Sequence, residues 1–229
     1  MLALVGSGEY LPGMEPVDRE LLARLGDDAR VVCLPTGAGQ EGDDRIAYWS
    51  QLGIDHFTRL GAQVQSVRVV DRASAHDAEL ARAIAAANFV YFSGGKPDYL
   101  HRTLAASPAW QAVLSVLARG GLLAGCSAGA MMQGEKILGL PLLQQGFNLV
   151  PGCVIMPHFD EIAGAARSLI HMRVGSGLTL LGVEADTALV ITGERAEVLG
   201  SGGVTVWSQS DPVRYLQGPV PWPPVSPGR

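Results

Sequence analysis

The segment Gly125–Gly129 has the pattern Gly-x-Ser-x-Gly, which is typical of a serine nucleophile. In this pattern the serine occupies a sharp, strained turn between a strand and a helix, and small flanking residues let the two elements approach closely. An apolar run precedes Ser127 and a helix-compatible run follows it, so the sequence supplies the context that the pattern needs. We therefore predict that Ser127 attacks a carbonyl carbon. A tight glycine-rich turn without catalysis is the alternative.

The start of the helix after Ser127 is suited to negative charge. Backbone N–H groups point outward at a helix N-terminus, and the helix dipole favours an anion there. The N–H of Ala128 is therefore expected to be one donor of an oxyanion hole. Cys126, directly before the serine, is an alternative nucleophile, but the more frequent role of such a cysteine is that of a small buried hydrophobe.

A serine nucleophile needs a base, and histidine is the usual one. His158 follows the apolar run 154–157. In an open parallel sheet, ligands bind beyond the carboxyl ends of the strands, so this histidine is predicted to lie at the same edge as Ser127. The other four histidines fall within predicted helices or at their starts, where a structural or solvated role is more common. They are His56, His76, His101 and His171.

A carboxylate is expected to orient the imidazole of His158 and to stabilise its cation. Glu184 and Asp186 lie at the end of a predicted strand and are the leading candidates. Asp160 is an alternative, although it is only two residues from the histidine. Each of these acids also has a simpler explanation as a solvated turn carboxylate, which is the commoner fate of acidic side chains.

The elements that must position these residues follow a regular order. Strands are predicted at 2–5, 30–35, 64–70, 89–92 and 122–124, and helices at 43–60, 77–87 and from residue 108 onward. Apolar strands that alternate with helices predict an α/β fold with three layers (α/β/α) and a mostly parallel central sheet. Four closely spaced strands then predict an antiparallel extension toward the C-terminus, at 179–184, 187–192, 196–200 and 203–207.

Domain organisation follows from the distribution of proline. Residues 1–208 are expected to form a single α/β hydrolytic domain, and residues 209–229 a proline-rich C-terminal extension. The extension contains six prolines, which exclude a regular helix or a central strand there. Trp222 is the residue that we expect to dock it.

Composition excludes several classes of protein. The 229-residue chain has a net charge of −5, 48% hydrophobic residues and 29 glycines. Such a chain can bury a large core, which excludes disorder, and its negative charge argues against a strongly basic nucleic-acid binder. No apolar run is long enough to span a membrane, and no basic leader is visible. Three cysteines without a close pair fit free thiols in a reducing compartment, so we expect a cytoplasmic protein that needs no metal or organic cofactor.

Three motifs in this order carry a resemblance to a known family. The segments Gly125–Ala130, Phe92–Gly95 and Pro157–Phe159 together resemble the serine peptidase family of cyanophycinase and dipeptidase E. The resemblance covers residues 1–200 and implies a fold like that of the class I glutamine amidotransferases. It also implies that Ser127 is the nucleophile and His158 the base.

The same resemblance implies that the Gly94-Gly95 turn forms the second side of the oxyanion hole, with the N–H of Gly95 as the donor. Cyanophycinases carry an Asp-Gln pair at the turn and several arginines after the histidine, whereas this chain has Lys96 and, of those arginines, only Arg167. Digestion of the arginine-bearing polymer cyanophycin is therefore not expected. Substrate contacts are expected from Gly94, Lys96 and Arg167, with Arg173 as a further cation.

The position of the acid in cyanophycinases corresponds to Ala185, which Glu184 and Asp186 flank. Strand alternation aims both neighbours away from the face that residue 185 occupies. We expect a serine-type peptidase or amidase that cleaves a small peptide or isopeptide-like amide by a Ser-His-acid mechanism. The alternatives are a catalytically degenerate binding protein of the same fold, and an amidase or esterase acting on a non-peptide substrate. Neither nucleic acid nor a membrane is expected as a partner, and a homodimer is left open.

Overall fold

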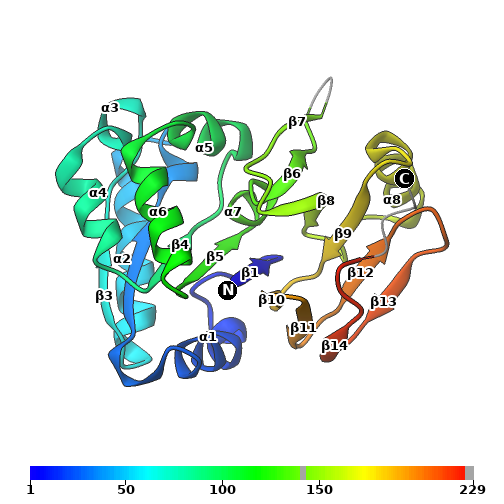
Figure 1. Cartoon of the computed structure of the whole chain (residues 1–229), viewed down its shortest axis with the longest axis horizontal. Coiled ribbons are helices and arrows are strands. Elements are labelled where there is room, and N and C mark those ends of the chain that lie inside the picture. Colours follow the sequence, from blue (N-terminus) through cyan, green and yellow to red (C-terminus); the bar gives the residue numbers. More distant parts are fainter. Residues whose placement is uncertain (140–142, 225–229) are drawn as a thin grey trace.

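The computed structural model describes residues 1–139 and 143–224, which form two β-sheets with helices around them (Figure 1). Five strands of the larger sheet are parallel, and three more continue it in antiparallel fashion. In spatial order they are β14 (Gly218–Val220), β11 (Arg195–Gly200), β10 (Thr187–Thr192), β1 (Leu2–Val5), β5 (Leu122–Cys126), β4 (Phe89–Phe92), β2 (Arg30–Leu34) and β3 (Gln63–Ser66). The predicted α/β class with a mostly parallel central sheet is confirmed.

Several helices begin where the sequence supplies a cap or a first-turn proline. Asp77 accepts hydrogen bonds from two N–H groups of α4, and Ser107 caps α6, whose first residue is Pro108. The α-helices are α1 (Glu15–Ala23), α2 (Asp43–Arg59), α3 (Arg72–Ala75), α4 (Ala78–Ala85), α5 (Pro97–Leu104), α6 (Pro108–Ala118), α7 (Ala128–Met131) and α8 (Gly164–Val174).

The two faces of the larger sheet are covered differently. In β1, Ala3 and Val5 pack in one core cluster with residues of α1 and α2, whereas Leu4 packs on the opposite side with residues of the second sheet. On that same opposite side, β2, β4 and β5 pack in a cluster with α4 and α6. Figure 1 accordingly shows these helices at one end of the molecule and the second sheet at the other. The three layers are therefore helix, sheet and helix at one end, and helix, sheet and sheet at the other.

The second sheet was not predicted from the sequence. Its spatial order is β13 (Val213–Tyr215), β12 (Val204–Trp207), β9 (Thr179–Val183), β8 (Val150–Pro157), β6 (Gly134–Ile137) and β7 (Gln144–Gln145). Strands β8 and β9 pair in parallel with each other and not with the central sheet. An apolar strand buried on both faces has the same sequence pattern in either sheet, because the pattern reports burial and not the identity of the neighbouring strand.

The proline-rich segment after residue 208 adds an edge strand to each sheet. β13 lies at the edge of the second sheet and β14 at the edge of the larger one. Edge positions tolerate proline, because one side of the strand forms no ladder hydrogen bonds. Trp222 packs, partly buried, against the core between the sheets, as expected, and residues 225–229 lie outside the described residues. None of the helices in the described part of the chain is long and apolar enough to cross a membrane.

Candidate active site

Ser127 lies at a strained turn between β5 and α7, as the Gly-x-Ser-x-Gly pattern predicts. Its backbone has φ 52° and ψ −111°, in a region that residues other than glycine rarely occupy. The N–H of Ser127 donates to the Val5 carbonyl at 3.1 Å, which ties the turn to the neighbouring strand. The hydroxyl makes no capping hydrogen bond to α7 and is therefore available for another partner.

That partner is His158, which follows β8. Its Nε2 lies 2.8 Å from Ser127 Oγ, within hydrogen-bond distance for proton transfer. The next residue, Phe159, is 1% exposed, and its N–H donates to the Val183 carbonyl. A buried neighbour thus anchors the loop, although the strand before the histidine belongs to the second sheet. The structure brings together the predicted nucleophile and the predicted base.

Two backbone N–H groups beside Ser127 are free to bind an oxyanion. In the described ranges, the N–H groups of Gly95 and Ala128 have no hydrogen-bond acceptor. Ala128 is the first residue of α7, and Gly95 has φ 127°, which favours glycine. The turn packs closely on the serine, because a Cβ added to Gly94 would lie 3.4 Å from Ser127 Cβ. The Gly94-Gly95 turn therefore packs on Ser127 and the first residue of α7 follows it in the sequence, with one N–H in each segment that has no acceptor among the described residues.

Glu184 and Asp186, the leading candidates for the acid, are not brought to His158. Glu184 binds Arg214, with N···O distances of 2.6 and 2.7 Å, and accepts the N–H of Gly203 at 2.8 Å. The carboxylate of Asp186 lies instead against Gly8 and Gly13 beside β1. The chain turns between β9 and β10, where Asp186 has φ 49°, so strand alternation does not hold for these residues and the two side chains reach separate partners.

The loop after His158 carries two further carboxylates, one of which lies near the imidazole. Glu161 Oε1 is 4.0 Å from His158 Nδ1, and the Glu161 side chain is 65% exposed. Asp160 Oδ1 accepts the N–H of Ala185 at 3.0 Å and so joins this loop to the segment after β9. Asp160, which the sequence offers as an alternative acid, thus contacts Ala185, the residue that corresponds in position to the acid of cyanophycinases. The sequence analysis did not single out Glu161, which only its spacing of three residues from His158 could have indicated.

Glu184→Gln is expected to lower stability without lowering the turnover number more than about threefold. Its hydrogen bonds with Arg214 lower the pKa of the Glu184 carboxyl from its usual 4.5. The resulting stabilisation, about 1–2 kcal/mol for hydrogen bonds to a charged group, is complete above pH 4.5 and is lost as the pH falls further. Urea unfolding should therefore separate the variant from the wild type at pH 7 more than at pH 3. Glu194→Gln, at an exposed turn, is the control, and a separation that grows toward pH 3 would contradict the assignment.

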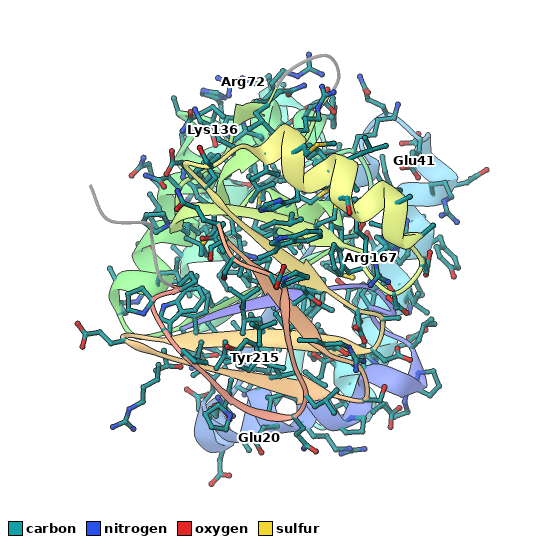
Figure 2. All side chains as sticks on the ribbon, turned by 90° about the vertical axis from the view of Figure 1, so that its right-hand side faces the viewer. Glu20, Glu41, Arg72, Lys136, Arg167 and Tyr215 are labelled. Carbon is teal, nitrogen blue, oxygen red and sulfur yellow. The ribbon has the colours of Figure 1, made fainter. Side chains whose placement is uncertain are left out.

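The cations expected to contact substrate are spread around the site. Lys96 is exposed at the Gly94-Gly95 turn, and its Nζ lies 3.4 Å from Gln40 Oε1. Arg167, labelled in Figure 2, lies near the start of α8, with its guanidinium 4.6 Å from the centre of the Phe159 ring. Arg173 donates to the Gly139 carbonyl at 2.8 Å. Lys96 is thus next to Gly95, and Arg167 packs on Phe159, the residue after His158. The two cations belong to different segments of the chain.

Beneath the site lies a buried carboxylate that the sequence analysis did not identify as functional. Glu9 is 8% exposed and accepts hydrogen bonds from Gly94 and Cys126. Cys126 is fully buried, and burial raises the pKa of its thiol well above the usual value, so its sulfur is poorly suited to act as a nucleophile. No group of three or more metal-ligating side chains occurs in the described ranges.

Comparisons with known proteins identify the family of the chain. Residues 2–199 match the sequence model of peptidase family S51. A peptidase from an acI-B1 Actinobacterium is 31% identical, with 96% of each chain covered and a TM-score of 0.86. A putative peptidase E protein from Listeria monocytogenes EGD-e shares the fold at 19% identity and a TM-score of 0.67, covering 88% of this chain and 98% of that one. No curated protein matched. The resemblance found in the sequence is therefore confirmed, and the chain belongs to peptidase family S51.

Proposed function

We propose that this peptidase is a serine hydrolase that cleaves a small peptide or an isopeptide-like amide through Ser127. The observation that carries the proposal is the 2.8 Å contact between Ser127 Oγ and His158 Nε2 at a strained elbow bordered by two free N–H groups. A turn without catalysis has no need to hold a serine at φ 52° or to leave N–H groups unpaired. These features together support acyl transfer.

The proposed reaction uses these groups in sequence. His158 takes the proton of Ser127 as Oγ attacks the carbonyl carbon, and the N–H groups of Gly95 and Ala128 stabilise the oxyanion that forms. The protonated imidazole then gives its proton to the leaving amine, which leaves an acyl-serine. Water, deprotonated by the same imidazole, hydrolyses this ester and restores the serine. All groups required for this sequence belong to the chain itself.

The experiment that tests the proposal measures both labelling and turnover of the purified protein. A fluorophosphonate, which reacts with activated serines, is expected to label one site per chain, and peptide mapping should find the adduct on Ser127. A panel of dipeptides and isopeptides should then include a substrate that is hydrolysed. Lys96 and Arg167 motivate acidic members of the panel, compared directly with alanine analogues. Absence of labelling together with absence of hydrolysis would refute the proposal.

Glu161→Gln is expected to reduce kcat/KM by less than about tenfold, whereas His158→Ala should reduce it by about 10³-fold or more. The Glu161 carboxylate is exposed and lies 4.0 Å from Nδ1, so solvent screens its effect on the imidazolium. His158 contacts the nucleophile directly and supplies the base. Steady-state kinetics of the two variants check the difference. A loss at Glu161 as large as that at His158 would show that the loop closes to make a tight hydrogen bond during catalysis.

A second candidate function is ligand binding by a site whose catalysis has degenerated. It is favoured by one observation: no carboxylate of the described residues lies within hydrogen-bond distance of His158 Nδ1. A binding protein would still react with the fluorophosphonate, since Ser127 and His158 are in contact, but it would hydrolyse no member of the peptide panel. Labelling without turnover would therefore support binding, and turnover would exclude it.

A further inference from the structure

The buried Glu9 carboxylate joins the two segments that carry the proposed chemistry. Its Oε1 accepts the N–H of Gly94 at 2.9 Å, and its Oε2 accepts the thiol of Cys126 at 2.9 Å. Gly94 directly precedes the proposed oxyanion donor Gly95, and Cys126 directly precedes the proposed nucleophile Ser127. The Glu9 side chain, which is 8% exposed, therefore contacts both the residue before the proposed oxyanion donor and the residue before the proposed nucleophile.

Both partners of Glu9 are donors, and a carboxylate without a proton accepts from both. Burial, and next the Glu9 carboxylate itself, raises the pKa of the Cys126 thiol well above its usual value, so the thiol keeps the proton that it donates. No cation pairs with Glu9 in the part of the chain that the structure describes. Burying a carboxylate costs free energy unless the carboxylate is hydrogen-bonded. The hydrogen bonds from Gly94 and Cys126 therefore offset the cost of burying Glu9.

The residues on both sides of Glu9 have positive φ angles. Gly8 has φ 89° and Tyr10 has φ 65°, both in the left-handed region. Tyr10 is 2% exposed and packs against Tyr91, with 5.0 Å between the ring centres. A bulky aromatic residue is disfavoured in this conformation, and such strain persists where the surrounding structure fixes it, often at a functional site.

The hydrogen bond from the Gly94 N–H to Glu9 also constrains the orientation of the following N–H, that of Gly95. It holds the N–H of Gly94 on the buried Glu9 carboxylate, while the N–H of Gly95 has no acceptor among the described residues. The packing is tight, since a Cβ on Gly94 would lie 2.9 Å from Glu9 Oε1 and 3.4 Å from Ser127 Cβ. Without an acceptor at Glu9, the buried N–H of Gly94 loses its partner, and the hydrogen bond from the Lys96 N–H to the Gly37 carbonyl alone would have to hold this side of the turn.

We propose that Glu9 is a positioning residue, which holds the Gly94-Gly95 turn so that the N–H of Gly95 faces the oxyanion formed at Ser127. This inference rests on the proposed hydrolase function, and it adds to that function a residue which never touches substrate. Gly95 supplies the hydrogen bond to the oxyanion, and Glu9 sets its direction.

Three variants of Glu9 test the inference. Glu9→Met keeps the volume but has no carboxylate acceptor, Glu9→Asp keeps the charge on a shorter side chain, and Glu9→Gln keeps an acceptor at Oε1. Removing one oxyanion donor costs about 10²–10³-fold in rate. We expect fluorophosphonate labelling by Glu9→Met to slow about a hundredfold and by Glu9→Asp about tenfold, with the same final stoichiometry as the wild type. Glu9→Gln should stay within about fivefold of the wild type. Peptide kinetics should show the loss in kcat with KM changed less than threefold.

Asp18→Asn is the matched control, because Asp18 is a fully buried carboxylate that hydrogen-bonds to His56 at 2.8 Å and makes no hydrogen bond to Gly94 or Cys126 in the described residues. It is expected to lower the melting temperature and to leave the labelling rate unchanged. A wild-type labelling rate in Glu9→Met, or in Glu9→Asp should Glu9→Met not fold, would overturn the inference and leave the hydrolase function intact. If the wild type neither labels nor hydrolyses, the hydrolase function fails instead. A crystal structure of Glu9→Met then decides the positioning role, and an unchanged Gly94-Gly95 turn would refute it.

Discussion

Ser127→Ala is expected to abolish fluorophosphonate labelling and to lower kcat/KM for peptide hydrolysis by about 10⁴-fold or more. The variant removes the only atom that can form the acyl intermediate, while the remaining groups of the site stay in place. The N–H groups of Gly95 and Ala128 still bind the carbonyl oxygen, so a small residual rate above that of water is expected. Substrate binding should change little, because the serine hydroxyl contributes one hydrogen bond.

The loss in Ser127→Ala must come from chemistry and not from unfolding. Residue 127 has φ 52°, and alanine is strained there to about the same degree as serine, so the melting temperature should stay close to that of the wild type. Ser115→Ala, at a helical serine of α6 whose Oγ donates to the Ala112 carbonyl, is the control and should keep full activity. Undiminished labelling of Ser127→Ala would show that another nucleophile reacts, and the proposed mechanism would be wrong.

The contact between Ser127 and His158 could be predicted from the sequence, because each residue follows an apolar run whose end identifies the edge of a sheet. The Gly-x-Ser-x-Gly pattern also predicted the strand before Ser127, which is β5, and the helix after it, which is α7. His158 contacts Ser127 although β8 belongs to a different sheet from β5. The prediction of this contact depended on where the strand ends and not on which sheet the strand joins.

The contacts of Glu9 and Glu184 could not be predicted in the same way. Each carboxylate is explained by a partner far away in the sequence: Gly94 for Glu9, and Arg214 for Glu184. Arg214 lies in the proline-rich segment, whose composition gave no indication that it would pair with Glu184. Local patterns report the direction of a side chain and its burial, whereas the choice of partner depends on how the two sheets pack.

Gly125, the first glycine of the Gly-x-Ser-x-Gly pattern, gives the second prediction with a large expected effect. Gly125→Ala is expected to lower the free energy of unfolding by about 3 kcal/mol or more, and to slow fluorophosphonate labelling at least about a hundredfold. A Cβ at residue 125 would collide with the carbonyl oxygen of Gly129, which is backbone, and would lie 2.9 Å from Gln133 Nε2. Because Gly125 is in the central strand β5, paired with Leu4 on one side and Phe92 on the other, the strand cannot shift to relieve the collision.

The helix α7 must move instead, and this is why stability and activity should fall together. Ala128 is the first residue of α7, so a displacement of the helix carries the proposed oxyanion donor away from the substrate carbonyl. Gly177→Ala, where an added Cβ meets no atom within 4 Å, controls for the loss of a glycine and should change neither quantity. Urea unfolding and labelling rates of both variants provide the measurement. A Gly125→Ala protein that is as stable as the wild type but labels slowly would show that only the donor has moved. One that is destabilised but labels at the wild-type rate would show that the approach of strand to helix serves folding alone, and that the first glycine of the pattern has no part in the chemistry.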